Sequence, residues 1–166
     1  VNVLIENSTR KNSRDYYLRF GMEMKEYIEF VGHPMLYACW DTGHAHMEGV
    51  DQYESIVTLG NLLRGLHIAD NLGNADSHTA PFFGTCNFDA VMQGLLDIQY
   101  AGTFNYECEN VVFPQNSWPH KRKPWFYKGE EVKTLHQIPL HIKKKAVALC
   151  YEIGKHILTS YNCFEE

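Results

Sequence analysis

Short apolar runs alternate with amphipathic stretches along the chain. The apolar runs, each interpreted as a buried strand, are Val3–Ile5, Met35–Trp40, Leu63–Ala69 and Phe104–Cys108. The stretches between them repeat apolar residues at helical spacing, which predicts helices over Phe20–Val31, near Asp51–Leu59, from an N-cap at Asn87, and around Ala146–Ile157. Strands that alternate with helices four times predict parallel strands joined by right-handed crossovers, and therefore an α/β fold.

Such units can form either an open doubly wound sheet or a (β/α) barrel. No glycine-rich phosphate loop follows the first strand, which weakens the case for a nucleotide-binding sheet. A complete eight-unit barrel takes about 250 residues, whereas this chain has 166. The sequence therefore predicts one TIM-barrel type domain over 1–166 with about four βα units, in which 111–139 is a long loop insertion after the last strand.

The composition of the chain indicates which partners and which cellular compartment to expect. The net charge of -5 argues against a primary role on nucleic acid. The five cysteines show no CxxC spacing, as expected for reduced thiols of a cytoplasmic protein. No apolar run approaches the roughly 20 residues that span a bilayer, so we expect no membrane partner. Because an apolar run opens the chain at Val1 without a Met, we expect an upstream segment or a partner to complete the core.

Each predicted strand ends in a residue that can bind a metal or transfer a proton. Glu6 ends the first strand, Asp41 and His44 follow the second, His67 lies in the third and Glu107 lies in the fourth. The C-terminal ends of barrel strands meet at one mouth, where active sites of this architecture lie. Charged groups are costly at such buried positions unless they are neutralised, and a shared cation would neutralise them.

The motifs around these residues resemble the last four strands of xylose isomerase-like barrels. The motifs are Ile5-Glu6-Asn7-Ser8, Asp41-Thr42-Gly43-His44, Leu66-His67-Ile68-Ala69-Asp70-Asn71, Asp76-Ser77-His78, and Tyr100-Ala101-Gly102 through Glu107. That superfamily includes sugar and sugar phosphate isomerases and epimerases, inosose-processing enzymes and the endonuclease IV type of DNA repair enzyme (AP endonuclease family 2). The resemblance implies the C-terminal half of a barrel, so an N-terminal half-barrel would be missing.

The resemblance to the epimerase branch implies a role for each strand-end residue. Glu6 and Glu107 would bind the metal and exchange the substrate proton, and Asp41 and His67 would complete the ligand set. Moving a proton next to a carbonyl needs a base on one face, an acid on the other and a cation that stabilises the enediolate. Three oxygens and one nitrogen suit Mn²⁺, Co²⁺ or Mg²⁺, with Zn²⁺ as a further option. The expected function is a metal-dependent isomerase or epimerase of a sugar, sugar phosphate or cyclitol.

Further residues are candidate substrate contacts. The resemblance assigns substrate oxygens to His44, and Asp76 and His78 lie in the loop after the third strand. The epimerases often place an arginine in that loop, where this chain has Asn71 through Asp76 instead. Glu109 shares the facing of Glu107 by strand alternation, and the spacing from Tyr100-Ala101-Gly102 favours Glu107.

Two other interpretations stay open. An endonuclease IV-like zinc phosphodiesterase would act on abasic DNA through a three-zinc cluster, and its ligands have counterparts in Glu6, Asp41, His44, His67, Asp76, His78 and Glu107. Only the basic clusters at 120–123 and 143–145 favour nucleic acid. Alternatively, the chain is an inactive half-barrel. Exposed strand edges promote association, so we expect a homo-oligomer unless the N-terminal half is supplied.

Four aromatic residues of the long loop have two interpretations. Trp118, Trp125, Phe126 and Tyr127 could cover the barrel mouth and stack on a sugar ring, or they could cover the helix layer or a partner surface.

Overall fold

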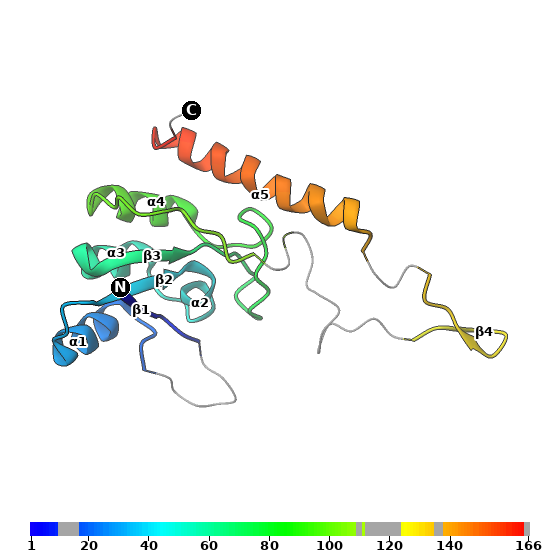
Figure 1. Ribbon diagram of the computed structural model, residues 1–166, viewed down its shortest axis with the longest axis horizontal. Coiled ribbons are helices and arrows are strands. Elements are labelled where there is room, and N and C mark those ends of the chain that lie inside the picture. Colours follow the sequence, from blue (N-terminus) through cyan, green and yellow to red (C-terminus); the bar gives the residue numbers. More distant parts are fainter. Residues whose placement is uncertain (10–16, 109–110, 112–123, 135–137, 165–166) are drawn as a thin grey trace.

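The body of the protein is a parallel sheet in the computed structural model, which describes residues 1–9, 17–108, 111, 124–134 and 138–164 (Figure 1). The sheet has the order β1-β2-β3, with β1 at Val3–Glu6, β2 at Leu36–Asp41 and β3 at Leu63–His67. Glu6 pairs with Cys39, and Asp41 pairs with His67. The carboxyl ends of the three strands therefore lie at the same edge of the sheet, as the sequence predicts.

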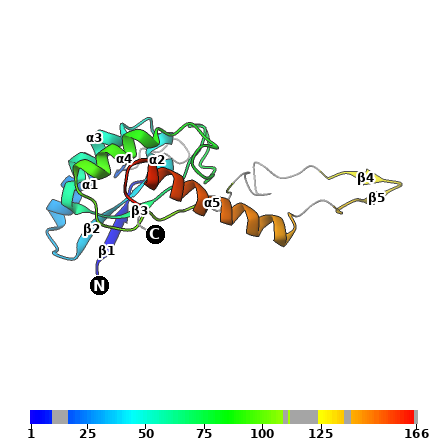
Figure 2. The ribbon, with the colours of Figure 1, turned by 90° about the horizontal axis from the view of Figure 1, so that it is seen from above.

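Helices cover one face of this sheet (Figure 2). They are α1 at Gly21–Val31, α3 at Gln52–Leu59 and α4 at Phe88–Asp97, with α5 at Leu140–Ser160 next to α4. Helix α1 ends at Gly32, whose φ of 62° is the left-handed conformation that glycine adopts without strain. The largest fully buried apolar side chains are Met24, Trp40, Ile56, Leu59, Leu66, Ile68 and Val91. The predicted alternation of strands and helices is confirmed in this core.

The fourth predicted strand is reduced to one parallel bridge between Ile68 and Tyr106. The Ile68 amide donates to the Asn105 carbonyl at 2.8 Å, and the Glu107 amide donates to the Ile68 carbonyl at 3.1 Å. Phe104–Cys108 is therefore not a full strand, because among the described residues two backbone hydrogen bonds join it to Ile68, directly after β3. The bridge still places Glu107 beside the end of β3.

Two short elements between the strands are not predicted by the hydrophobic pattern. Helix α2 spans Thr42–Met47, and the 3-10 helix η1 spans Gly60–Leu62. Helix α2 begins directly after β2, because the Asp41 side chain accepts a hydrogen bond from the His44 amide at 2.6 Å. This cap places His44 on the first turn of a helix at the carboxyl edge of the sheet.

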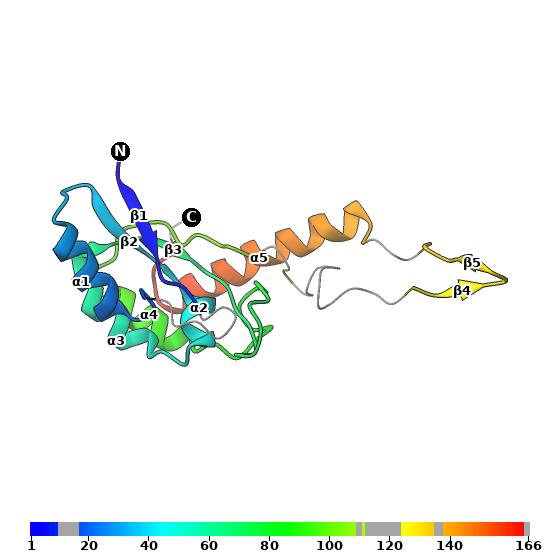
Figure 3. The ribbon, with the colours of Figure 1, turned by 90° about the horizontal axis from the view of Figure 1, so that it is seen from below.

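The region predicted as a long loop contains an antiparallel hairpin. Its strands are β4 at Phe126–Tyr127 and β5 at Glu130–Glu131. Trp125 stacks on Tyr127 with ring centroids 6.1 Å apart. The hairpin lies away from the sheet and its helices, so in this structure its aromatic side chains cover neither of them (Figure 3). Trp118 lies outside the described residues. None of the described helices combines the length and the apolar character needed to cross a membrane.

Candidate metal centre

The four predicted metal ligands converge at the carboxyl edge of the sheet. Glu6, Asp41, His67 and Glu107 each offer one ligand atom, and these atoms lie within 4.8 Å of one another. The Nδ1 atom of His67 lies 3.1 Å from Glu6 Oε1 and 3.0 Å from Glu107 Oε2. Side chains that are far apart in the sequence are therefore brought to one point by parallel strand ends.

Asp41 is the buried member of this cluster, with 0% of its surface exposed. Its Oδ1 atom caps helix α2, whereas its buried Oδ2 atom has no hydrogen-bond partner among the described residues. Burial raises the pKa of Asp41 to about 6, although His44 nearby acts in the opposite direction. A buried carboxylate oxygen without a donor is costly, and a cation at this point would satisfy it.

The donor set fits a divalent metal ion. It consists of three carboxylates and one imidazole, with Glu6, Asp41, His67 and Glu107 as the residues that would hold the ion. The side chains of Glu6, His67 and Glu107 are 34%, 30% and 37% exposed. These three side chains of the cluster are therefore partly open to solvent.

A second group of titratable side chains adjoins the cluster. His44 Nε2 and His78 Nε2 each lie 3.2 Å from Asp76 Oδ2. The Nδ1 atoms face backbone carbonyls, that of Asn7 for His44 and that of Glu107 for His78, each at 2.9 Å. Each imidazole thus has an acceptor at both ring nitrogens, an arrangement that favours the doubly protonated ring.

The electrostatics of this group agree with its geometry. Burial alone would lower the pKa of His44, but the hydrogen bond to Asp76 and the charges of Asp41 and Asp76 raise it to about 9. The hydrogen bond to Asp76 likewise raises the pKa of His78 to about 9, against the effect of burial. Burial opposes ionisation of Asp76, yet its two histidine partners hold the pKa of Asp76 well below its usual range. Asp76 therefore favours the protonated form of both imidazole rings near neutral pH, beside a cluster that is rich in carboxylates.

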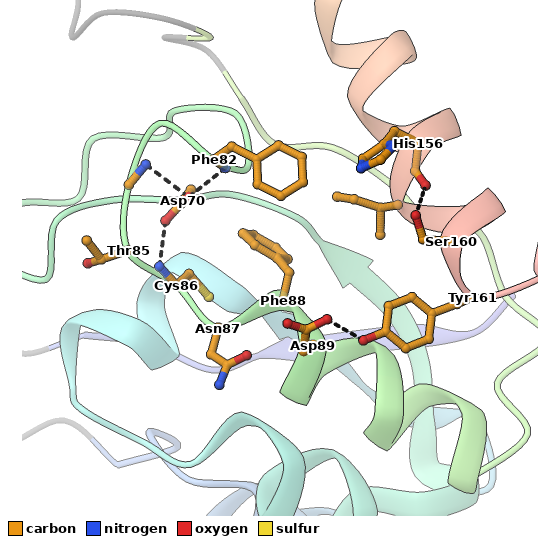
Figure 4. A pocket seen from close by; sticks show the side chains of 12 residues that line it. Asp70, Phe82, Thr85, Cys86, Asn87, Phe88, Asp89, His156, Ser160 and Tyr161 are labelled. Carbon is orange, nitrogen blue, oxygen red and sulfur yellow. Dashed lines mark hydrogen bonds between the residues drawn. The ribbon is translucent and has the colours of Figure 1, made fainter.

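The loop that carries Asp76 and His78 is built around Asp70, which is 1% exposed. Asp70 Oδ1 accepts from the Asn71 and Cys86 amides at 2.8 and 3.0 Å. Asp70 Oδ2 accepts from the Phe82 and Gly84 amides at 3.1 and 3.0 Å (Figure 4). One buried carboxylate thus holds the two ends of the segment 70–86, which carries Asp76 and His78 beside the cluster.

A cleft of about 360 Å³ lies on this loop, between the start of α4 and the end of α5. Phe82, Phe88, His156 and Tyr161 are among its lining residues, and the Tyr161 hydroxyl donates to Asp89 across it (Figure 4). None of the four cluster residues lines this cleft. It is therefore a feature separate from the candidate metal centre.

Some residues near the site are not among the predicted ones. The Asn7 side chain bonds the backbone of Asp41, and Thr42 Oγ1 donates to the Ala69 carbonyl at 2.7 Å. His46, which the pattern does not assign to the site, has Nε2 2.9 Å from Thr85 Oγ1 and supports the loop. Glu109, the competitor of Glu107, lies outside the described residues. The position of Asn7 directly after Glu6 in the first motif is the one signal that could have drawn attention to it.

Comparisons with known proteins agree with this architecture. The sequence model of the xylose isomerase-like TIM barrel family matches residues 1–129. The uncharacterized protein y4fM of Sinorhizobium fredii (strain NBRC 101917 / NGR234) is 27% identical over 121 residues, which cover 71% of this chain and 37% of that protein.

Two solved structures are similar over nearly the whole chain. A D-tagatose 3-epimerase-like protein superposes with a TM-score of 0.64 at 21% identity, over 98% of this chain and 48% of that one. A D-psicose 3-epimerase, solved in the presence of D-fructose, superposes with a TM-score of 0.65 at 18% identity, over 95% of this chain and 50% of that one. At these identities the likeness shows the fold.

The chain thus spans half or less of the length of the proteins it matches. The predicted half of a (β/α) barrel is confirmed by the family match and by these superpositions. The chain belongs to the xylose isomerase-like TIM barrel family.

Proposed function

We propose that this chain carries the metal and proton-transfer site of an epimerase or isomerase that acts on a sugar, sugar phosphate or cyclitol. The observation that carries the proposal is the position of two glutamates around one candidate metal cluster. Glu6 comes from β1 and Glu107 from the segment beside β3, with Asp41 and His67 between them in the sheet order. A substrate held over the middle of the cluster would have one glutamate on each side.

This placement suits proton exchange at a carbon next to a carbonyl. Glu6, Asp41, His67 and Glu107 would hold a divalent cation, which would supply positive charge to polarise the carbonyl and an adjacent hydroxyl. One glutamate, as a carboxylate, takes the proton from the carbon and leaves an enediolate. The other glutamate, as a carboxylic acid, returns a proton to the opposite face of the same carbon, which inverts its configuration. The proton taken and the proton returned balance, and exchange of both glutamates with water resets the site.

The two charged histidines fit the same reaction. His44 and His78 lie beside the cluster, and the rings contact each other edge to face with centroids 6.1 Å apart. Positive donors next to the cluster would stabilise the negative charge that develops on substrate oxygens. We assign His44, Asp76 and His78 to substrate binding on this ground, with Asp76 as the partner that keeps both rings charged.

The similar structures support the choice of reaction class. One of them is named a D-psicose 3-epimerase and another a D-tagatose 3-epimerase-like protein, and this chain shares their fold. The five cysteines are all free thiols, which agrees with a cytoplasmic setting for the enzyme.

Solvent exchange tests the proposal. The protein is loaded with Mn²⁺ or Co²⁺ and incubated with ketohexoses in D₂O, and deuterium in the recovered sugar is measured by NMR. Glu6→Gln and Glu107→Gln are each expected to abolish exchange into the recovered epimer, because one glutamate must take the proton and the other must return it, and an amide can do neither. Glu130→Gln, at an exposed carboxylate on β5, is the matched control and should retain it. Exchange retained in both glutamate variants would remove the acid/base assignment.

A zinc phosphodiesterase is the second candidate, and the closeness of His44, Asp76 and His78 is the observation that favours it. The ligand atoms of this group also lie within 4.8 Å of one another, so two groups that could each hold a metal ion adjoin. The net charge of -5 disfavours it, because phosphodiester backbones attract basic surfaces. Cleavage of an oligonucleotide with one abasic site in the presence of zinc would establish this alternative.

The length of the chain bears on whether it acts alone. Because it spans about half of the similar structures, we propose that an N-terminal half-barrel, or a second copy of this chain, completes the mouth around the cluster. Full activity without any such partner would contradict this part of the proposal.

A further inference from the structure

The side chain of Asn7 continues the sheet beyond the last pair of β1 and β2. The backbone ladder between these strands ends at the pair of Glu6 with Cys39. Beyond it, Asn7 Nδ2 donates to the Asp41 carbonyl at 2.9 Å, and Asn7 Oδ1 accepts from the Asp41 amide at 2.6 Å. Asn7 is 1% exposed, so its amide group takes the place of a neighbouring strand for the backbone of one residue.

The backbone of the same residue orients a second member of the site. The Asn7 carbonyl accepts from His44 Nδ1 at 2.9 Å, and the His44 amide in turn donates to Asp41 Oδ1 at 2.6 Å. Asn7, Asp41 and His44 thus form a closed set of buried or partly buried hydrogen bonds. Because Oδ1 of Asp41 is held in this set, Oδ2 is the oxygen left for the cluster of Glu6, His67 and Glu107.

We propose that Asn7 is a positioning residue of the metal centre, which fixes the Asp41 carboxylate and the His44 ring in the orientation that metal binding needs. This inference rests on the proposed metal site. Asparagine suits the task because its short side chain presents one donor and one acceptor to the two backbone groups of a single residue. Aspartate lacks the donor, and alanine lacks both.

Cobalt binding to variants tests this role. Wild-type protein, Asn7→Ala and Gln52→Ala are titrated with Co²⁺, with the visible spectrum as the readout, and their thermal unfolding is followed without metal. Gln52 is the matched control: it is 5% exposed, and its amide makes hydrogen bonds of 2.8 Å to Trp40 Nε1 and to the Thr42 carbonyl. Gln52→Ala removes a buried amide of the same kind, and in the described part of the chain the hydrogen bonds of this amide go to Trp40, Thr42 and Cys86 and to no residue of the cluster.

Both variants are expected to unfold at lower temperature than the wild type. Asn7→Ala alone should also bind Co²⁺ about 10–100-fold more weakly, the usual effect of removing a group that orients a ligand. Its absorption bands at saturating Co²⁺ should shift, because Asp41 is no longer held, whereas Gln52→Ala should give the wild-type bands and affinity.

Other results would overturn the inference. If Asn7→Ala binds Co²⁺ with the same affinity and the same visible spectrum as Gln52→Ala, Asn7 stabilises the fold but does not position the metal ligands. Wild-type protein that binds no Co²⁺ would overturn the metal centre itself, a failure that the wild-type titration alone reveals. If Asn7→Ala does not fold, Asn7→Ser, whose hydroxyl can still bond one backbone group, is titrated instead. It is expected to bind Co²⁺ more weakly than Gln52→Ala, and equal affinity would refute the role.

Discussion

The buried carboxylate of Asp70 offers a quantitative test of how the loop over the site is held. Four backbone amides donate to it, two to each oxygen. Asp70→Asn preserves the shape of the side chain, but an NH₂ group replaces one of the two carboxylate oxygens. This NH₂ group faces two backbone amides that also donate, so both of their hydrogen bonds are lost. A hydrogen bond to a charged group contributes about 1.5–3 kcal/mol, so two lost bonds correspond to about 3–6 kcal/mol before relaxation. We expect a loss near the lower end of that range.

Thermal unfolding by circular dichroism measures this loss. For a chain of this size, about 1 kcal/mol corresponds to about 2–4 °C in the melting temperature, so a loss of about 3 kcal/mol predicts a drop of about 6–12 °C. The control is Asp97→Asn at an exposed carboxylate that also accepts two side-chain hydrogen bonds, from Tyr53 and Gln93. Exposed substitutions change stability by about 0.5 kcal/mol or less. A melting temperature for Asp70→Asn equal to that of Asp97→Asn would refute the role assigned to Asp70.

Three further predictions follow from packing, thiol burial and the open sheet edge. Gly21→Ala should lower the free energy of unfolding, measured in urea, by about 1–3 kcal/mol, because the new Cβ would lie 2.3 Å from the Ser55 carbonyl oxygen of α3. An unchanged free energy of unfolding would show that α1 can move away from α3. At pH 8, one thiol per chain, that of the exposed Cys163, should react quickly with DTNB. Burial raises the pKa of the other four thiols, those of Cys39 and Cys86 to about 12. A second fast thiol would contradict the packing around these cysteines. Sedimentation should show association at micromolar concentration, because β1 has a free edge: in the described part of the chain it pairs with β2 alone. Its residues Val3 and Leu4 are also 58% and 40% exposed. A monodisperse monomer with a cooperative melt would contradict this prediction.

The cluster could be predicted from the sequence because parallel topology determines where strand ends lie. Once the apolar runs identify the strands, Glu6, Asp41 and His67 must share one edge of the sheet. Glu107 was also predicted correctly as a neighbour, although its segment forms a single bridge and not a full strand. One pair of backbone hydrogen bonds is enough to place Glu107 at the carboxyl edge of the sheet. The predicted length of the strand Phe104–Cys108 was therefore wrong without consequence for the position of Glu107.

The parts that escaped prediction are those that side chains build. Helix α2 has six residues, too few for a hydrophobic period, and it depends on the Asp41 cap. Asn7 and Asp70 read as ordinary polar residues in the sequence, because nothing local shows that their partners are backbone groups 34 and up to 16 positions away. The β4–β5 hairpin does have a local signal in the sequence, which is Gly129, because glycine readily adopts the positive φ that Lys128 and Gly129 both have in the turn.

The content of bound metal per chain tests the central claim most directly. Purified protein is reconstituted separately with Mn²⁺, Co²⁺ and Zn²⁺, freed of excess metal, and measured by elemental analysis against protein concentration. The four-residue cluster predicts about one ion per chain, and Asp41→Ala should lose it, because this change removes the one buried carboxylate of the set. Two or three zinc ions per chain would favour the phosphodiesterase instead. No bound metal after reconstitution would contradict the account, because it would show that the converged side chains do not form a metal centre in this chain.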